Sequence, residues 1–175
     1  MNAATEAQSA AEGVDAAWKT VLEGDDLARQ AAQLVTETTA ENVEASKRKT
    51  NEALAAFDEA YAAFLDVQAT YPQADLTQFV DYIAKRQESL GYAIASDDAI
   101  LAKNKEEATA QNNAYNIADA EAATLAKALP DDPSSIVDEA FEDATSDVAK
   151  AYSTARLQAR SADAFISDYL GAGSK

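Results

Sequence analysis

Apolar side chains recur every three or four residues along most of this chain. The clearest series follows Pro72, and its members are Leu76, Val80, Ile83, Gln87, Leu90, Ile94, Asp97, Leu101, Asn104, Ala108, Gln111, Tyr115, Ala118, Ala122, Leu125 and Leu129. Alternating steps of three and four place all these residues on one side of an α-helix. The series predicts one long helix over 75–129, about 80 Å in length. Gly91 and Asp97 mark the stretch where it could break.

Shorter stripes of the same period predict helices over 3–23, 25–70 and 134–170. Their members include Val14, Trp18, Val21, Leu54, Phe57, Tyr61, Phe64, Val137, Phe141, Val148, Phe165 and Tyr169. Pro72 and Pro130 separate the segments, because proline lacks a backbone donor and restricts the residue before it. Gly24 is a weaker signal, so the first two helices are either separate or continuous.

The chain shows no alternating strand pattern, and its connections between helices are short. Short connections make consecutive helices antiparallel neighbours. We therefore expect an all-α fold: a single domain over 1–175 forming an elongated antiparallel up-and-down bundle of three or four helices. The many alanines on the apolar stripes favour close, coiled-coil-like packing.

The acidic composition excludes one class of partner. The chain has 31 acidic and 14 basic residues, a formal net charge of −17. Binding to nucleic acid requires lysine and arginine to displace phosphate counterions, so no nucleic-acid partner is expected. The densest basic run, Lys47-Arg48-Lys49, lies between Glu44 and Glu52 and is interpreted as a solvated helix face with ion pairs.

The residues that most often perform chemistry are missing. The chain has no Cys and no His, which excludes thiolate nucleophiles, imidazole bases and the usual zinc ligands. No phosphate-binding glycine loop and no Ca²⁺ loop occurs. The carboxylates Asp131, Asp132, Glu139, Glu142 and Asp143 are interpreted as a solvated acidic surface. We expect no catalytic residue, no metal site, no cofactor and no enzymatic activity.

Four polar residues occupy positions of the long apolar series, namely Gln87, Asp97, Asn104 and Gln111. They could form a polar channel or an ion site in the bundle core. The preferred interpretation is that they set the helix register or face solvent. Trp18 shares its stripe with Val14 and Val21 and is interpreted as a core anchor rather than a partner-binding residue.

Several short motifs resemble the LemA family in their order and spacing. They are Val14-Asp15-Ala16-Ala17-Trp18-Lys19-Thr20-Val21, then Arg29, Leu34-Val35 and Thr38, then Tyr71-Pro72 with Leu76 and Phe79, and finally Ala114-Tyr115-Asn116, Thr124 and Leu129-Pro130. The resemblance covers residues 14–130. Three features differ: the run Gln30–Val35 lacks the family's proline, a second Tyr-Asn pair is absent before Pro130, and a helix over 134–170 replaces a short tail.

The resemblance implies a helical domain outside the cytoplasmic membrane, attached by an anchor upstream of this chain. No run of about 18 apolar residues occurs within the chain itself. The family has no established molecular function, and the resemblance supplies no catalytic residues. The sequence indicates neither the protein partner nor the oligomeric state.

Three functional classes follow from the sequence. The first is a non-catalytic structural or protein-interaction module, the extracytoplasmic domain of a LemA-like membrane-anchored protein. The alternative is a soluble, self-assembling coiled-coil protein such as a virion or filament component. The least favoured class is a bundle that binds a small molecule or a metal ion.

Overall fold

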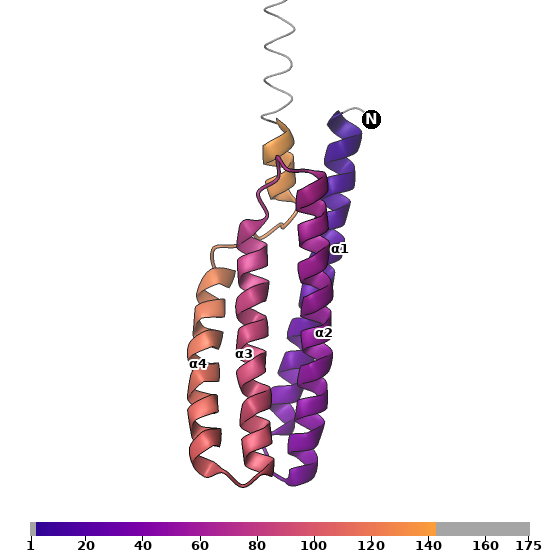
Figure 1. The fold of residues 1–175 in the computed structure, drawn as a ribbon. Helices are drawn as coiled ribbons and strands as arrows, with labels where there is room; N and C mark the ends of the chain where they lie inside the picture. Colours follow the sequence, from indigo (N-terminus) through magenta and orange to yellow (C-terminus); the bar gives the residue numbers. More distant parts are fainter. Residues whose placement is uncertain (1–2, 143–175) are drawn as a thin grey trace, which may run out of the picture.

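The computed structural model describes residues 3–142, which form an antiparallel helical bundle (Figure 1). Its four long helices are α1 (Ala3–Leu34), α2 (Ala40–Thr70), α3 (Thr77–Leu101) and α4 (Lys105–Ala126). Successive helices run in opposite directions, and residues 135–142 form a short additional helical segment. The predicted all-α, elongated up-and-down fold is confirmed. No helix in residues 3–142 has the length and apolar character needed to cross a membrane.

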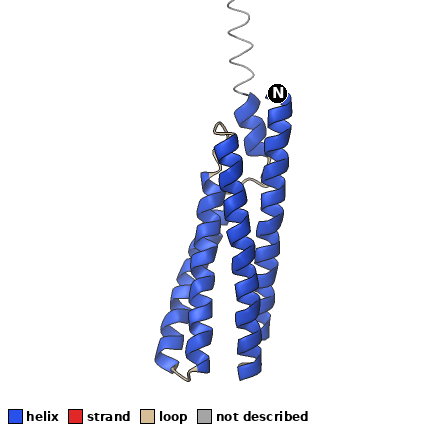
Figure 2. Ribbon diagram, turned by 45° about the vertical axis from the view of Figure 1, so that its right-hand side comes forward, coloured by secondary structure: helices blue, strands red, loops and turns tan. Residues whose placement is uncertain are grey.

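The helices pack in the order of the chain. α1 lies along α2, α2 also contacts α3, and α3 lies along α4 (Figure 2). α4 is therefore an outer helix that packs mainly against α3. It buries only two side chains, Ala118 and Ala122.

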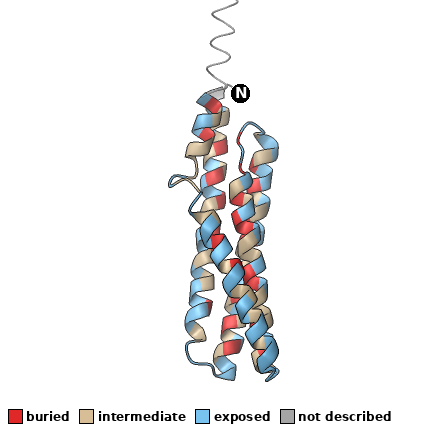
Figure 3. Ribbon diagram, turned by 90° about the vertical axis from the view of Figure 1, so that its left-hand side faces the viewer, coloured by how far each residue is buried: buried red, intermediate tan, exposed pale blue. Residues whose placement is uncertain are grey.

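The core is built from large side chains of the first three helices. Its fully buried members include Val14, Val21, Phe57, Phe64, Phe79 and Ile83. The rings of Phe64 and Phe79 stack with their centroids 5.0 Å apart. Buried positions lie on the inward faces of the helices, and exposed positions face outward (Figure 3). The three- and four-residue spacing in the sequence produces this division.

Trp18 anchors α1 to α3, as predicted. Its indole is half-buried and packs against the core. The ring meets that of Phe79 edge-on at a centroid distance of 5.7 Å, and that of Tyr82 at 6.2 Å. An edge-on contact of this kind adds about 0.5–1.5 kcal/mol to the burial of the two rings.

Residues 135–142 cover the end of the core next to the turn between α2 and α3. Val137 and Phe141 are buried in the same cluster as Leu76. The rings of Tyr71 and Phe141 lie 6.3 Å apart. The helix predicted over 134–170 therefore starts at residue 135. Its part after residue 142, Asp143 included, lies outside the described residues.

Of the two alternatives left open at Gly24, the structure has the continuous one, because α1 runs through this residue to Leu34. Gly24 is buried, and a Cβ there would lie 3.1 Å from the Phe57 ring. This glycine allows α1 and α2 to approach closely and does not end a helix. The predicted helix 25–70 is instead divided at residues 35–39. Thr39 caps α2 there, and its side chain accepts a hydrogen bond from the Asn42 amide at 3.2 Å.

The single helix predicted over 75–129 is also wrong. Helix α3 ends at Leu101, the chain reverses its direction through residues 102–104, and α4 begins at Lys105. Lys103 has a φ of 58°, the left-handed conformation that commonly ends helices. Asn104 then caps α4 by accepting a hydrogen bond from the Glu107 amide at 3.2 Å. Gly91, the expected weak point, remains inside α3.

Candidate functional site

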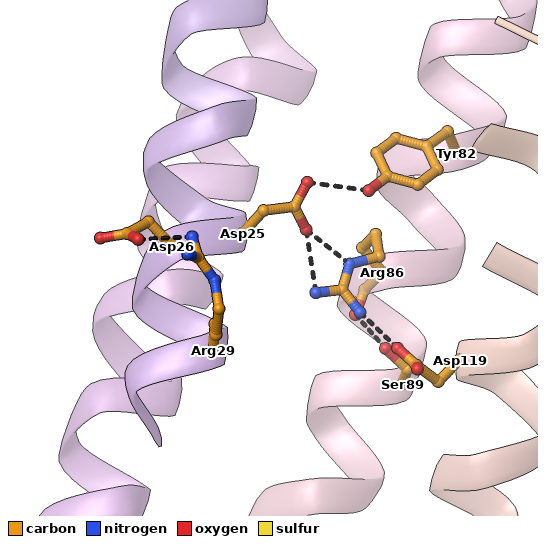
Figure 4. A network of polar contacts seen from close by, with 7 residues as sticks. All are labelled: Asp25, Asp26, Arg29, Tyr82, Arg86, Ser89 and Asp119. Carbon is orange, nitrogen blue, oxygen red and sulfur yellow. Dashed lines mark hydrogen bonds and ion pairs between the residues drawn. The ribbon is translucent and has the colours of Figure 1, made fainter. Parts of the chain in front are cut away.

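Arg86 on α3 is the centre of a polar network that joins three helices (Figure 4). Its Nε donates to Asp25 Oδ1 of α1 at 2.9 Å, and its Nη1 donates to Asp119 Oδ1 of α4 at 2.5 Å. The Tyr82 hydroxyl donates to Asp25 Oδ2 at 2.9 Å. One guanidinium thus holds carboxylates from two other helices, a task that suits its planar, forked set of donors.

Arg86 and Tyr82 hold their protons more firmly in this network than they do in water. Burial alone would lower the pKa of Arg86, but the charges of Asp25 and Asp119 raise it above its usual value. Burial, and then the charge of Asp25, also raise the pKa of Tyr82 well above its usual value. The guanidinium lies 5.6 Å from the centre of the Phe57 ring, which adds a cation–π contact. These properties suit the joining of helices better than proton transfer.

A cavity of about 100 Å³ lies between the four helices, at the end where α1 stops and α2 begins. Its lining residues are Ala28, Ala31, Ala32, Val35, Ser46, Thr50, Leu90, Ala93, Ser96, Asp97, Asn112 and Tyr115. The α1 wall is entirely apolar, whereas α2, α3 and α4 contribute polar groups. Two lining residues, Ala32 and Asn112, are exposed, so the cavity is accessible from solvent.

Asp97 is the charged residue of this cavity. It is only 6% exposed, and its Oδ2 has no hydrogen-bond partner among the described residues. Burial, followed by the charge of Asp98, raises the pKa of the Asp97 carboxyl. A hydrogen bond with Ser46 and the charge of Lys47 act in the opposite direction. Lys47 itself is paired with Asp98 at 2.5 Å.

The four polar residues singled out in the long apolar series do not come together. Gln87 donates to Asp58 of α2 at 2.6 Å, Gln111 donates to Glu107 at 2.6 Å, and Asn104 is a helix cap. Only Asp97 lines the cavity. The polar channel, the less favoured alternative, is therefore not formed, because the turn at residues 102–104 separates Asn104 and Gln111 from the α3 series.

The sequence interpretation missed the Arg86 network. Arg86 follows Ile83 by three residues and precedes Leu90 by four, so it lies on the buried side of α3. Tyr82, four residues earlier, shares that side. A charged residue at such a position indicates a buried partner, but the sequence does not show that Asp25 and Asp119 supply it.

The predicted acidic surface near Pro130 is solvated where the structure describes it. Asp131, Asp132, Glu139 and Glu142 are exposed. Within residues 3–142, no cluster of three or more carboxylates could hold a metal ion.

The chain matches no protein-family model, no curated protein and no solved structure.

Proposed function

We propose that this chain is a non-catalytic structural or protein-interaction module, the extracytoplasmic domain of a LemA-like protein anchored in the cytoplasmic membrane. The observation that carries the proposal is where the residues of the resemblance lie. Val14, Trp18 and Val21 of the opening motif pack in one core cluster with Leu76 and Phe79, which follow the Tyr-Pro turn. Motifs far apart in the sequence therefore act together in the fold.

These motif residues are apolar and contribute packing rather than chemistry. The Trp18 and Phe79 rings contact each other at 5.7 Å, and Tyr71 of the turn contacts Phe141 at 6.3 Å. The shared pattern thus specifies a helical scaffold. A scaffold acts through its shape and surface, which supports an interaction or spacing role rather than a catalytic one.

The Arg86 network supports the same role. It uses part-buried charges to join α1, α3 and α4. A rigid bundle keeps its surface residues at constant positions. Such a surface can bind a partner without a large loss of conformational entropy.

Fractionation of the native host cells tests the location. For this test the chromosomal copy of the gene is fused to a C-terminal epitope tag. A cytoplasmic enzyme serves as the internal control. We expect the tagged protein to sediment with membranes and to be digested when intact spheroplasts are treated with protease. A tagged protein that stays in the soluble fraction, or that resists protease as the cytoplasmic control does, would contradict the proposal.

Self-assembly is the second candidate, and one exposed residue favours it. Ile117 lies near the middle of the outer helix α4 and is 64% exposed. Ala110, Ala120 and Thr124 lie on the same exposed side at helical spacing. Glu107 and Lys127 are equally far from Ile117 along the chain, on opposite sides. Two antiparallel copies of α4 that meet at Ile117 would therefore bring these opposite charges together.

Sedimentation velocity over a wide concentration range tests this candidate. Self-association through α4 predicts a dimer that Ile117→Lys converts to a monomer. Leu65→Lys is the matched control, because Leu65 is an exposed apolar residue of α2, 43% exposed. A native chain that stays monomeric at the highest concentration excludes self-assembly. A dimer that both substitutions disrupt equally would place the contact elsewhere.

A further inference from the structure

The cavity around Asp97 combines a buried carboxylate with an apolar wall. Burying an ionised carboxylate costs several kcal/mol unless a cation or hydrogen-bond donors compensate. Ser46 supplies one hydrogen bond, and Oδ2 receives none from the described residues. Lys47, the nearby cation, is already paired with Asp98. Asp97 lines the cavity, so a cation held there lies close to a buried carboxylate whose own charge it can offset.

Two hydroxyl groups of the cavity lining can accept hydrogen bonds from a ligand. The Ser96 hydroxyl donates its proton to the Ala108 carbonyl at 3.3 Å, and the Thr50 hydroxyl donates to the Ser46 carbonyl at 3.0 Å. Each hydroxyl then keeps only its acceptor lone pairs for a ligand. An ammonium group is the complementary species, because it has three donors and no acceptor. Asn112 and Tyr115 also line the cavity and carry donors, but the buried Asp97 carboxylate disfavours an anion there.

The opposite wall indicates what the ammonium is attached to. Ala28 and Ala31 of α1, with Val35 just after it, line this side and offer no oxygen ligands from their side chains. Ca²⁺ needs six to eight oxygen ligands around it, so this wall suits an aliphatic group better than a bare metal ion. The cavity, at about 100 Å³, is smaller than the ~150 Å³ cavity that holds benzene in another protein. A chain of a few carbon atoms fits.

We propose that this cavity binds a small primary alkylammonium compound, whose ammonium group pairs with Asp97 and whose aliphatic chain lies against the α1 wall. Ser46 fixes the carboxylate, while Thr50 and Ser96 accept further hydrogen bonds from the ammonium. The net charge of −17 concentrates cations near the protein and assists their entry. This binding site is independent of the proposed membrane location.

Thermal unfolding monitored by the single tryptophan tests the proposal. The probes are n-propylammonium chloride, sodium chloride at the same ionic strength, and 1-propanol at the same concentration. We expect n-propylammonium to raise the Tm by about 3 °C or more above the sodium chloride value at saturation. 1-Propanol, which has the aliphatic chain without the charge, should give no such rise.

Two asparagine variants locate the effect. Asp97→Asn should remove the n-propylammonium response, whereas Asp98→Asn, a change of the same type at the adjacent exposed residue, should keep it. A third variant, Ala93→Leu, fills the cavity while Asp97 stays in place, and it should also remove the response. The third variant decides the matter if Asp97→Asn does not fold.

Four results would overturn the proposal. Sodium chloride that matches the n-propylammonium rise would indicate screening or inorganic cation binding. An equal rise with 1-propanol would remove the role of the charge. A response that survives in Asp97→Asn or in Ala93→Leu would place binding outside the cavity, and a response lost in Asp98→Asn would place it at the exposed ion pair.

Discussion

Arg86 joins the bundle through charge at a point where the outer helix contributes little apolar area. Its side chain is 11% exposed, whereas those of Asp25 and Asp119 are 30% and 42% exposed. The carboxylates can therefore gain some hydration if Arg86 is removed, but the guanidinium cannot gain hydration if the carboxylates are removed. The network is thus most sensitive to the loss of the two aspartates together.

Replacement of Arg86 by methionine measures how much the network contributes to the free energy of unfolding. Met keeps much of the side-chain volume but leaves two carboxylates without their cation, so we expect the free energy of unfolding to fall by about 2 kcal/mol. Arg29→Met is the control, because the Arg29–Asp26 pair is exposed and should contribute less than about 0.5 kcal/mol. Urea denaturation of both variants tests this. Equal, small losses would show that Arg86 contributes no more than a surface pair.

The raised pKa of Tyr82 predicts that the folded chain loses stability at high pH. Its usual pKa is 10.0, and burial together with the charge of Asp25 raises the pKa in the folded state. The folded chain therefore keeps the phenol proton at pH values where the unfolded chain loses it. This contribution is fully present below pH 10.0 and is lost as the pH rises through the folded pKa. Asp25 of α1, Arg86 of α3 and Asp119 of α4 are the charged groups around the phenol.

Comparison with Tyr82→Phe isolates this effect, because the titration of the lysines affects both chains. At pH 8 the native chain should be more stable than Tyr82→Phe by about 1 kcal/mol, the value of one hydrogen bond. Urea denaturation at increasing pH should show this advantage shrinking above about pH 10. An advantage that stays constant would mean that the phenol titrates alike in both states.

At the scale of the helix, two glycines inside helices have opposite roles. A Cβ at Gly24 would meet the Phe57 ring at 3.1 Å, whereas a Cβ at Gly91 would have no neighbour within 4 Å. Leucine at Gly24 should therefore force α1 and α2 apart and reduce the free energy of unfolding by about 1–3 kcal/mol. Leucine at Gly91 should increase it by about 0.5–1 kcal/mol, because glycine weakens a helix.

Urea denaturation of Gly24→Leu and Gly91→Leu measures the two effects with the same substitution. The opposite signs are the essential result. Destabilisation by both changes would mean that Gly91 has a packing role that its open surroundings do not indicate. Stabilisation by both would mean that the Phe57 ring moves aside without cost.

The helical period predicted the fold class but not every helix end. A turn of three residues keeps the faces of α3 and α4 in phase, so the apolar series continues across it unbroken. Lys103 also makes the turn difficult to predict from sequence, because the left-handed conformation that it adopts is usually found at glycine. The available signal was Asn104 followed by Glu107, the residue spacing of a helix cap.

The sequence singled out the position of Asp97 but not the cavity. Its place in the apolar series allowed either a register-setting residue in the core or a residue that faces solvent, and the structure shows the first, with Asp97 6% exposed. The cavity, however, depends on small side chains from four separate helices, such as Ala28 of α1 and Ser46 of α2. No local pattern in a sequence shows which small residues meet in space, so the cavity follows only from the packing.

At the scale of the whole molecule, the net charge of −17 opposes folding. Like charges lie closer together in the folded bundle than in the unfolded chain, so repulsion among them reduces stability. Salt screens exposed charges, with a Debye length of about 10 Å at 0.1 M. Part-buried pairs such as Arg86 with Asp25 are screened less. Added salt should therefore weaken the repulsion more than it weakens the network.

We accordingly expect the Tm to rise as sodium chloride increases from low concentration to about 0.3 M, and then to level off as the Debye length becomes short. Potassium chloride at equal ionic strength is the control, because screening depends on ionic strength rather than on the identity of the cation. Differential scanning calorimetry measures both series. A Tm that falls with salt would mean that exposed pairs such as Lys47 with Asp98 outweigh the repulsion. In that case the ion pairs on the surface would contribute more to the stability of the bundle than the repulsion among its acidic residues removes.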